Sequence, residues 1–292
     1  MKSNQVELIE VGPRDGLQNE PLPIPTEEKI RLVDQLTEAG FSRIEVTSFV
    51  SPKWVPQMAD AAAVMAGIRR KQTIRYGVLT PNLRGFENAL AAGADEVAIF
   101  GSASEGFSQK NINCSIAESL ERFRPVTMAA AEHGIPVRGY ISCVIACPYD
   151  GNTSPEAVAG VAETLLEMGC YEISLGDTIG AGTPHQIAAM LDSVVPRLGA
   201  SRLAGHYHDT GGQALANIDT SLEYGLRRFD SAVGGLGGCP YAPGAKGNVS
   251  TVMLARHLEK TGWITGLDLN LLAEIEVFIR SLGIKDKDES NG

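Results

Sequence analysis

The chain of 292 residues carries a formal net charge of −10 at pH 7, from 25 basic and 35 acidic side chains. Because a nucleic-acid-binding surface needs a basic face, this acidic balance argues against a nucleic-acid partner. No apolar run approaches the roughly 20 residues of a membrane-spanning helix, so we expect no membrane partner. An odd count of five cysteines and a start without an apolar leader indicate a reducing compartment, and we expect a cytoplasmic protein.

Short β-branched runs alternate with longer amphipathic segments along the whole chain. Strands are predicted at 6–11, 43–47, 74–79, 96–100, 136–142, 172–175, 202–206 and 228–231. Helices are predicted between them at 27–39, 83–92, 116–133, 155–168, 184–195 and 214–224, and after the last strand at 249–260 and 269–282. Thr26, Ser154 and Thr183 each stand directly before a predicted helix, where a capping hydroxyl is favoured.

The order of these elements indicates one fold class. Two neighbouring parallel strands need a crossover connection, which a helix between them supplies. Eight strand-then-helix units without a reversal of the pattern predict a closed (β/α)8 TIM barrel with extra C-terminal helices. We expect a single domain over 1–292, in which the barrel covers about 6–248, the C-terminal helices about 249–283 and a polar tail 284–292.

Polar and ionisable side chains gather where this fold places its catalytic groups, at the C-terminal ends of the strands. In strand order they are Arg14 and Asp15 after the first strand, Glu45 in the second, Asp177 at the end of the sixth, His206 and His208 at the seventh, and Cys239 and Asn248 after the eighth. This clustering indicates an enzyme.

A metal site is predicted around His206 and His208. Residues two apart in a strand point to the same side, so both imidazoles can reach one point. They could instead be two histidines of the core whose ring nitrogens are hydrogen-bonded. The spacing, the adjacent Asp209 and the presence of only five histidines favour metal ligands. In a closed barrel the eighth strand pairs with the first, which brings Asp15 and Asn248 beside them. Imidazoles with carboxylate and amide oxygens suit Mg²⁺ or Mn²⁺ better than structural zinc.

Arg14 and a glycine-rich run each allow more than one interpretation. Arg14 remains protonated and could form an ion pair with Glu45 or Asp177, stabilise an enolate oxygen beside the metal, or do both. The glycine-rich run 234–240 could be a phosphate cradle, or a mobile lid that carries Cys239 over the metal. A cysteine in a polar, glycine-rich segment favours a functional thiol over inert packing.

The chain contains the segments VGPRDGLQNE, IEVTSFVSPKWVPQM, NINCSIAESLERF, SLGDTIGAGTP, HYHDTGGQALAN and GGLGGCPYAPGAKGN. Together they resemble the 3-hydroxy-3-methylglutaryl-CoA lyases, which belong to the DRE-TIM metallolyase group. The resemblance covers nearly the whole chain. The RDGxQ element also resembles isopropylmalate and homocitrate synthases, whereas SFVSPKWVPQM and GGLGGCPYA are more specific to the lyases.

The resemblance implies a retro-Claisen cleavage of an acyl-CoA substrate to acetoacetate and acetyl-CoA by a homodimer. It implies these roles: Asp15, His206, His208 and Asn248 as ligands of Mg²⁺ or Mn²⁺, Arg14 as stabiliser of the acetyl-CoA enolate, Cys239 as an acid/base thiol on a lid, Glu45 and Asp177 as active-site carboxylates, and Gln18 as a polar substrate contact.

Two positions depart from the family pattern. Pro21 stands where members commonly carry Lys, which removes one expected coenzyme A contact. Gly211 replaces a Tyr, which predicts a wider pocket. The rival functions are a lyase for a longer 3-substituted 3-hydroxyglutaryl-CoA, a related Claisen-type synthase, and a non-catalytic barrel that serves as a scaffold.

Overall fold

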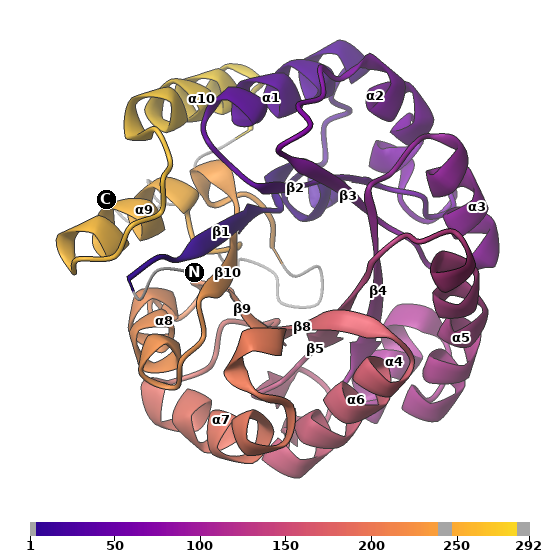
Figure 1. Cartoon of the computed structure of the whole chain (residues 1–292), viewed down its shortest axis with the longest axis vertical. Coiled ribbons are helices and arrows are strands. Elements are labelled where there is room, and N and C mark those ends of the chain that lie inside the picture. Colours follow the sequence, from indigo (N-terminus) through magenta and orange to yellow (C-terminus); the bar gives the residue numbers. More distant parts are fainter. Residues whose placement is uncertain (1–3, 239–246, 285–292) are drawn as a thin grey trace.

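The computed structural model describes residues 4–238 and 247–284. Eight strands close into a parallel barrel in the order β1-β10-β9-β8-β5-β4-β3-β2 (Figure 1). Their bounds are β1 Glu7–Glu10, β2 Arg43–Ser48, β3 Arg75–Leu79, β4 Glu96–Ser102, β5 Val137–Ser142, β8 Cys170–Asp177, β9 Leu203–Tyr207 and β10 Arg228–Ser231. The predicted barrel is confirmed, and each predicted strand ends within two residues of the observed one.

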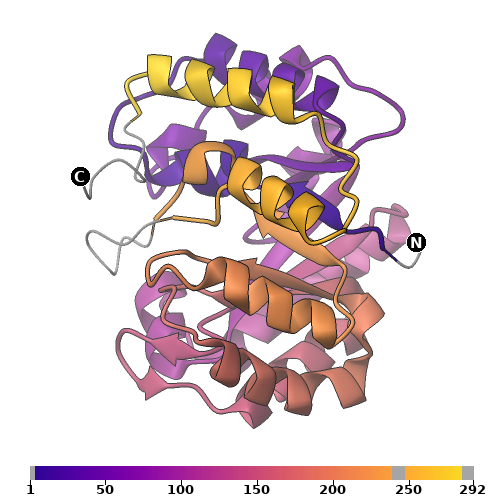
Figure 2. The ribbon, with the colours of Figure 1, turned by 90° about the vertical axis from the view of Figure 1, so that its left-hand side faces the viewer.

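Helices surround the barrel and alternate with its strands (Figures 1 and 2). They are α1 Thr26–Glu38, α2 Ala61–Gly67, α3 Leu83–Ala91, α4 Glu105–Ile112, α5 Ile116–Glu132, α6 Pro155–Glu167, α7 Pro184–Leu198, α8 Ala214–Glu223, α9 Thr251–Lys260 and α10 Leu269–Ser281. Helices α2 and α4 were not predicted, because seven or eight residues are too few to show a clear helical period. A small hairpin of β6 (Ala146–Cys147) and β7 (Gly151–Asn152) was not predicted either.

Two of the three predicted helix caps are confirmed. Ser154 and Thr183 cap α6 and α7, because each side chain accepts a hydrogen bond from the backbone N–H of the third residue of its helix. The prediction for Thr26 is wrong. Helix α1 begins at Thr26 itself, after Pro25, and the Thr26 hydroxyl donates to Asp60 Oδ2 at 2.8 Å. Because Thr26 is the first helical residue and not the N-cap, its hydroxyl does not cap the helix and instead links α1 to the segment before α2.

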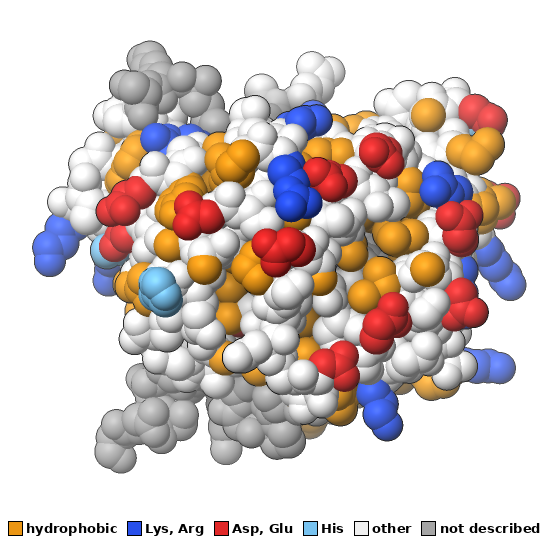
Figure 3. Space-filling view, turned by 90° about the horizontal axis from the view of Figure 1, so that it is seen from below, with side chains coloured by type: hydrophobic (Ala, Val, Ile, Leu, Met, Phe, Trp, Pro, Cys, Tyr) orange, Lys and Arg blue, Asp and Glu red, His pale blue; other side chains and the backbone are white. Residues whose placement is uncertain are grey.

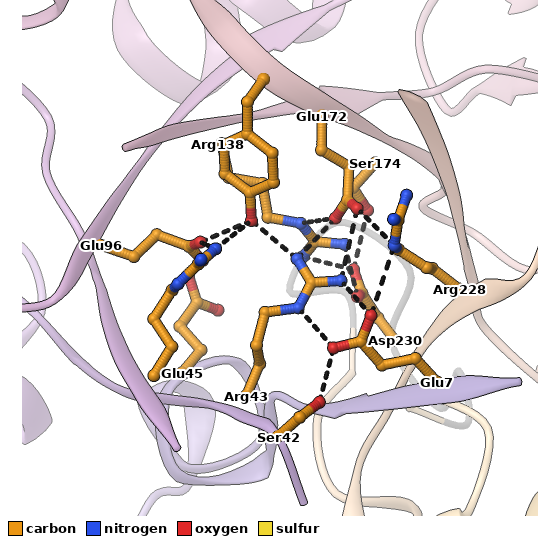
Figure 4. Close-up of polar contacts among 12 residues, drawn as sticks. Glu7, Ser42, Arg43, Glu45, Glu96, Arg138, Glu172, Ser174, Arg228 and Asp230 are labelled. Carbon is orange, nitrogen blue, oxygen red and sulfur yellow. Dashed lines mark hydrogen bonds and ion pairs between the residues drawn. The ribbon is translucent and has the colours of Figure 1, made fainter. Parts of the chain in front are cut away.

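Buried ion pairs cross the interior of the barrel (Figure 4). Five side chains from five strands form a series of alternating charge, which we name the barrel ladder: Glu7, Arg43, Glu172, Arg138 and Asp230. Each neighbouring pair is joined at 2.7–2.9 Å. A buried charge is tolerated when it is paired and hydrogen-bonded, and each member of the ladder has that support. The ladder therefore lets a charged layer fill the space below the mouth of the barrel.

Acidic and basic side chains are interspersed on the face that includes α6 and α7 (Figure 3). Among the helices that the structure describes, none combines the length and the apolar character that a bilayer crossing requires. Helix α10 packs beside α1 and α9 and covers the side of the barrel next to β1 (Figure 1).

Candidate active site and metal centre

Three potential metal ligands meet at the mouth of the barrel. Asp15 lies in the turn Gly12–Gly16 after β1, His206 in β9, and His208 directly after β9. Their candidate ligand atoms all lie within 4.8 Å of one another. Tyr207, between the histidines, points to the other side of the strand, where its hydroxyl bonds the Ser221 hydroxyl of α8 at 2.8 Å. The alternation of a strand thus directs both imidazoles to the site.

Local packing holds Asp15 in place. The backbone N–H groups of Arg14, Asp15 and Gly16 all donate to the carbonyl of Val11, which makes the turn tight. The turn also lies against the segment after β10, because a Cβ added at Gly16 would stand 2.6 Å from Leu236 Cβ. Only a glycine allows this approach. Ring closure therefore brings the β1 turn and the β10 segment together, as the sequence predicts.

Asn248 is the fourth residue that was predicted to bind the metal. Its Nδ2 donates to Asp15 Oδ2 at 2.8 Å and to the Leu236 carbonyl at 3.1 Å. Its Oδ1 is buried and has no hydrogen-bond partner among the residues that the structure describes. Buried amide oxygens are nearly always satisfied, so this unpaired acceptor beside a carboxylate and two imidazoles fits a cation. The four side chains form an oxygen and nitrogen donor set without a thiolate, which suits a hard or borderline divalent ion.

Arg14 lies against the proposed ligands. Its Nη1 donates to Asp15 Oδ1 and its Nε to Glu45 Oε2, both at 2.6 Å, and its guanidinium stands 5.4 Å from the centre of the Tyr140 ring. Burial opposes ionisation of Asp15, but Arg14 and the two histidines outweigh it and lower the pKa of that carboxyl to about 2. Gln18 also donates to Asp15 Oδ1, at 3.1 Å. The alternative of an Arg14–Glu45 ion pair is realised, and it leaves Arg14 beside the metal site.

The two predicted carboxylates occupy different settings. Glu45 accepts from Arg14 and from the Tyr140 hydroxyl on Oε2, while its Oε1 is buried and has no hydrogen-bond partner within residues 4–238 and 247–284. Burial raises the pKa of Glu45 in spite of Arg14. Asp177 ends β8 and accepts the backbone N–H groups of Gly182 at 2.8 Å and Ala181 at 3.3 Å. Burial raises the pKa of Asp177 as well, so both carboxyls are suited to take up a proton.

Cys239 lies outside the described residues. The residue before it, Gly238, accepts a hydrogen bond on its carbonyl from Asn19 Nδ2 at 3.2 Å. Gly237 lies close to Asn248, since a Cβ there would stand 2.8 Å from Asn248 Nδ2, and its φ of 110° also requires glycine. The described part of the glycine-rich run therefore lies against Asn248 and Asn19, beside the candidate metal site.

Sequence reasoning missed the residue that contacts His206. Asp230 of β10 pairs with His206 in the register of the sheet, and its Oδ2 lies 3.0 Å from His206 Nδ1. Arg138, which forms an ion pair with Asp230, was not predicted as a site residue either. Each of the two residues is a charged side chain inside a predicted, otherwise largely apolar strand, and this is the one feature of the sequence that could have drawn attention to them. That signal does not identify the partner, because Arg138 and Asp230 are 92 residues apart.

A family model, two related sequences and a solved structure all place this chain in the same family. The HMGL-like family model matches residues 5–279. A cytoplasmic 3-hydroxy-3-methylglutaryl-CoA lyase from Mus musculus is 58% identical over 274 residues, 94% of this chain and 80% of that protein. A 3-hydroxy-3-isohexenylglutaryl-CoA/hydroxy-methylglutaryl-CoA lyase from Pseudomonas aeruginosa is 58% identical over 270 residues, 92% of this chain and 90% of that protein. The crystal structure of an HMG-CoA lyase from Brucella melitensis has a TM-score of 0.94 at 60% identity, covering 95% of this chain and 98% of that one. The chain therefore belongs to the HMGL-like family.

Proposed function

We propose that this protein is a carbon–carbon lyase that cleaves 3-hydroxy-3-methylglutaryl-CoA to acetoacetate and acetyl-CoA with Mg²⁺ or Mn²⁺. The observation that carries the proposal is the contact of Arg14 with Asp15, at 2.6 Å, inside the cluster of Asp15, His206 and His208. A fixed cation then stands directly beside a site that can bind a chelating substrate. The names of the relatives from Mus musculus and Pseudomonas aeruginosa support the same reaction.

Asp15, His206, His208 and Asn248 would hold the cation, which supplies charge to bind the substrate's oxygens and to acidify its tertiary hydroxyl. Glu45 or Asp177 accepts the hydroxyl proton, because burial has raised the pKa of both. The bond between C2 and C3 then breaks. Its electron pair passes to the thioester as an enolate, and C3 becomes the ketone of acetoacetate.

Arg14 would stabilise the oxygen of this enolate, because its guanidinium is held in place by Glu45 before the charge develops. Cys239 would donate the proton that converts the enolate carbon to the methyl group of acetyl-CoA. Gln18 would contact the substrate beside Asp15. Each of these steps moves one proton or one electron pair, and the two protons balance between substrate and enzyme.

An assay of acetoacetate release tests the proposal. Purified protein is exhaustively chelated and then supplied with 3-hydroxy-3-methylglutaryl-CoA, with and without Mg²⁺ or Mn²⁺. We expect no turnover after chelation and full recovery on addition of either ion. Full activity without a metal would contradict the metal assignment, and the absence of turnover with either metal would favour the scaffold alternative.

One observation favours a second candidate, a lyase for longer 3-substituents. The Pseudomonas aeruginosa relative is named for both an isohexenyl and a methyl substrate. Gly211 is exposed here, and a Cβ at that position would stand 2.9 Å from the Gly180 carbonyl oxygen. A larger side chain would therefore press on the segment after β8. The same assay with the longer thioester separates the two substrates.

We also propose that the chain is a single-domain homodimer in the cytoplasm. The name of the Mus musculus relative supports the compartment. Sedimentation equilibrium tests the oligomeric state, and fractionation of cells that express the protein tests the location.

A further inference from the structure

Four hydrogen bonds converge on the buried carboxylate of Asp230. Arg138 donates to both of its oxygens, from Nη2 to Oδ1 at 2.7 Å and from Nη1 to Oδ2 at 3.1 Å. The Ser174 hydroxyl donates to Oδ2 at 2.7 Å. The fourth partner is His206 Nδ1, 3.0 Å from Oδ2. Asp230 is only 1% exposed, so these protein groups are its surroundings.

These contacts decide the tautomer of His206. A guanidinium can only donate, and an ionised carboxylate can only accept. With Arg138 on both oxygens, Asp230 is an acceptor, and His206 must supply a proton from Nδ1. A neutral imidazole carries one proton, so the lone pair then resides on Nε2. That atom points to the site, 3.8 Å from Asp15 Oδ2.

The barrel ladder fixes Asp230 in this position. Arg138 is held from its other side by Glu172, which accepts from Arg138 Nε at 2.8 Å and from Arg43 Nη1 at 2.8 Å. Figure 4 shows these side chains converging from different strands inside the barrel. None of them can rotate without breaking a buried, charge-assisted hydrogen bond. The orientation of His206 thus depends on side chains that do not touch the site.

We propose that Asp230 is the positioning residue of the metal centre, which orients the His206 ring and keeps its Nε2 unprotonated for the cation. The proposal rests on the proposed metal site. It identifies a residue outside the ligand set on which metal affinity depends. Partners in the second layer around a metal commonly have this effect.

The first experiment compares Mn²⁺ affinity by calorimetric titration in three purified proteins. Asp230→Asn keeps the size of the side chain, but its amide N–H can face His206 Nδ1 and force the proton to Nε2. We expect Mn²⁺ binding to weaken by about 10- to 100-fold, the usual effect of losing such a partner. Asp219→Asn is the matched control. It alters a similar Asp–His pair, with His257 Nε2 at 2.8 Å between α8 and α9, and should retain wild-type affinity.

The second experiment measures the tautomer in the wild-type protein, and a variant serves only to assign the His206 signal. A two-bond ¹H–¹⁵N correlation spectrum of metal-free wild-type protein reports the tautomer of each histidine, and the His206 signal is assigned by its loss in His206→Asn. We expect the Nδ1–H form. An Nε2–H form, or wild-type Mn²⁺ affinity in Asp230→Asn, would overturn the proposal. A wild-type protein that binds no Mn²⁺ would instead overturn the metal site, and the tautomer would still decide the role of Asp230.

Discussion

Arg14 Nε and Glu45 Oε2 lie 2.6 Å apart in a buried ion pair that joins the turn after β1 to β2. The two side chains are 7% and 6% exposed, so the pair is shielded from water. The remaining nitrogens of Arg14 include the one that contacts Asp15. The ion pair therefore holds the guanidinium in place against Asp15 of the candidate metal site.

Replacement of Arg14 by Gln should lower kcat by about 10²–10³-fold or more, the scale of losing one preorganised donor to a developing oxyanion. Because the enolate charge exists only as the C–C bond breaks, KM should change much less. Steady-state kinetics with 3-hydroxy-3-methylglutaryl-CoA measures both constants. Equal losses in substrate affinity and turnover would show that Arg14 serves in substrate binding and not in the transition state.

Replacement of Cys239 by Ala should slow turnover severely and leave Mg²⁺ and substrate binding intact, because a proton donor contributes to neither. Calorimetric titration of metal and substrate, run beside the turnover assay, separates the effects. Loss of metal binding would make the thiol a ligand and would contradict the assignment of Asn248. Wild-type turnover would exclude Cys239 as the donor and direct attention to Asp177.

Substrate choice should depend on Gly211. We expect 3-hydroxy-3-methylglutaryl-CoA to be the best substrate, with a modest preference over longer 3-substituents, since one methylene changes discrimination by about 1–3 kcal/mol. Gly211→Tyr should reduce kcat/KM for the longer thioester more than for the methyl one, which serves as the internal control. A much higher kcat/KM of the wild-type protein for the isohexenyl substrate would make this chain the longer-chain lyase.

Stability should depend on pH through Glu10, which is fully buried at the end of β1. Its carboxylate accepts from the backbone N–H of Gly12 and Val233 and from the Thr251 hydroxyl. Burial outweighs these bonds and raises the pKa of Glu10 from 4.5 to about 7. Between these values the folded chain retains a proton that the unfolded chain releases. The free energy of unfolding should therefore fall as the pH rises from 4.5, and the decrease should be complete above pH 7, where Glu10 is ionised in the folded chain as well.

Glu10→Gln removes this ionisation, and its amide can still accept from the backbone and donate to Thr251. We expect wild-type stability, relative to the variant, to fall by up to about 3 kcal/mol between pH 4.5 and 8, as 1.36 kcal/mol per pKa unit implies. Urea unfolding of both proteins across this range measures the difference. A difference that does not vary with pH would contradict the raised pKa of Glu10.

The amino-acid sequence alone was sufficient to predict the barrel and the meeting of Asp15, His206 and His208 at its mouth. Strand and helix periods are local, so eight alternating units could be recognised, and the closed barrel is confirmed. The spacing of His206 and His208 placed both imidazoles on one side of a strand. Closure of the ring then predicted the approach of Asp15, 191 residues before His206, and the structure brings their ligand atoms within 4.8 Å.

The tertiary structure decided which charges pair inside the barrel. Asp230 and Arg138 each lie in a correctly predicted strand, but the register of five strands selects their partners, and no local period records it. The same is true of Thr26, because only the folded chain brings its hydroxyl within 2.8 Å of the Asp60 carboxylate, 34 residues away. A buried charge or hydroxyl takes the strongest partner within reach, and only the folded chain establishes which groups are within reach.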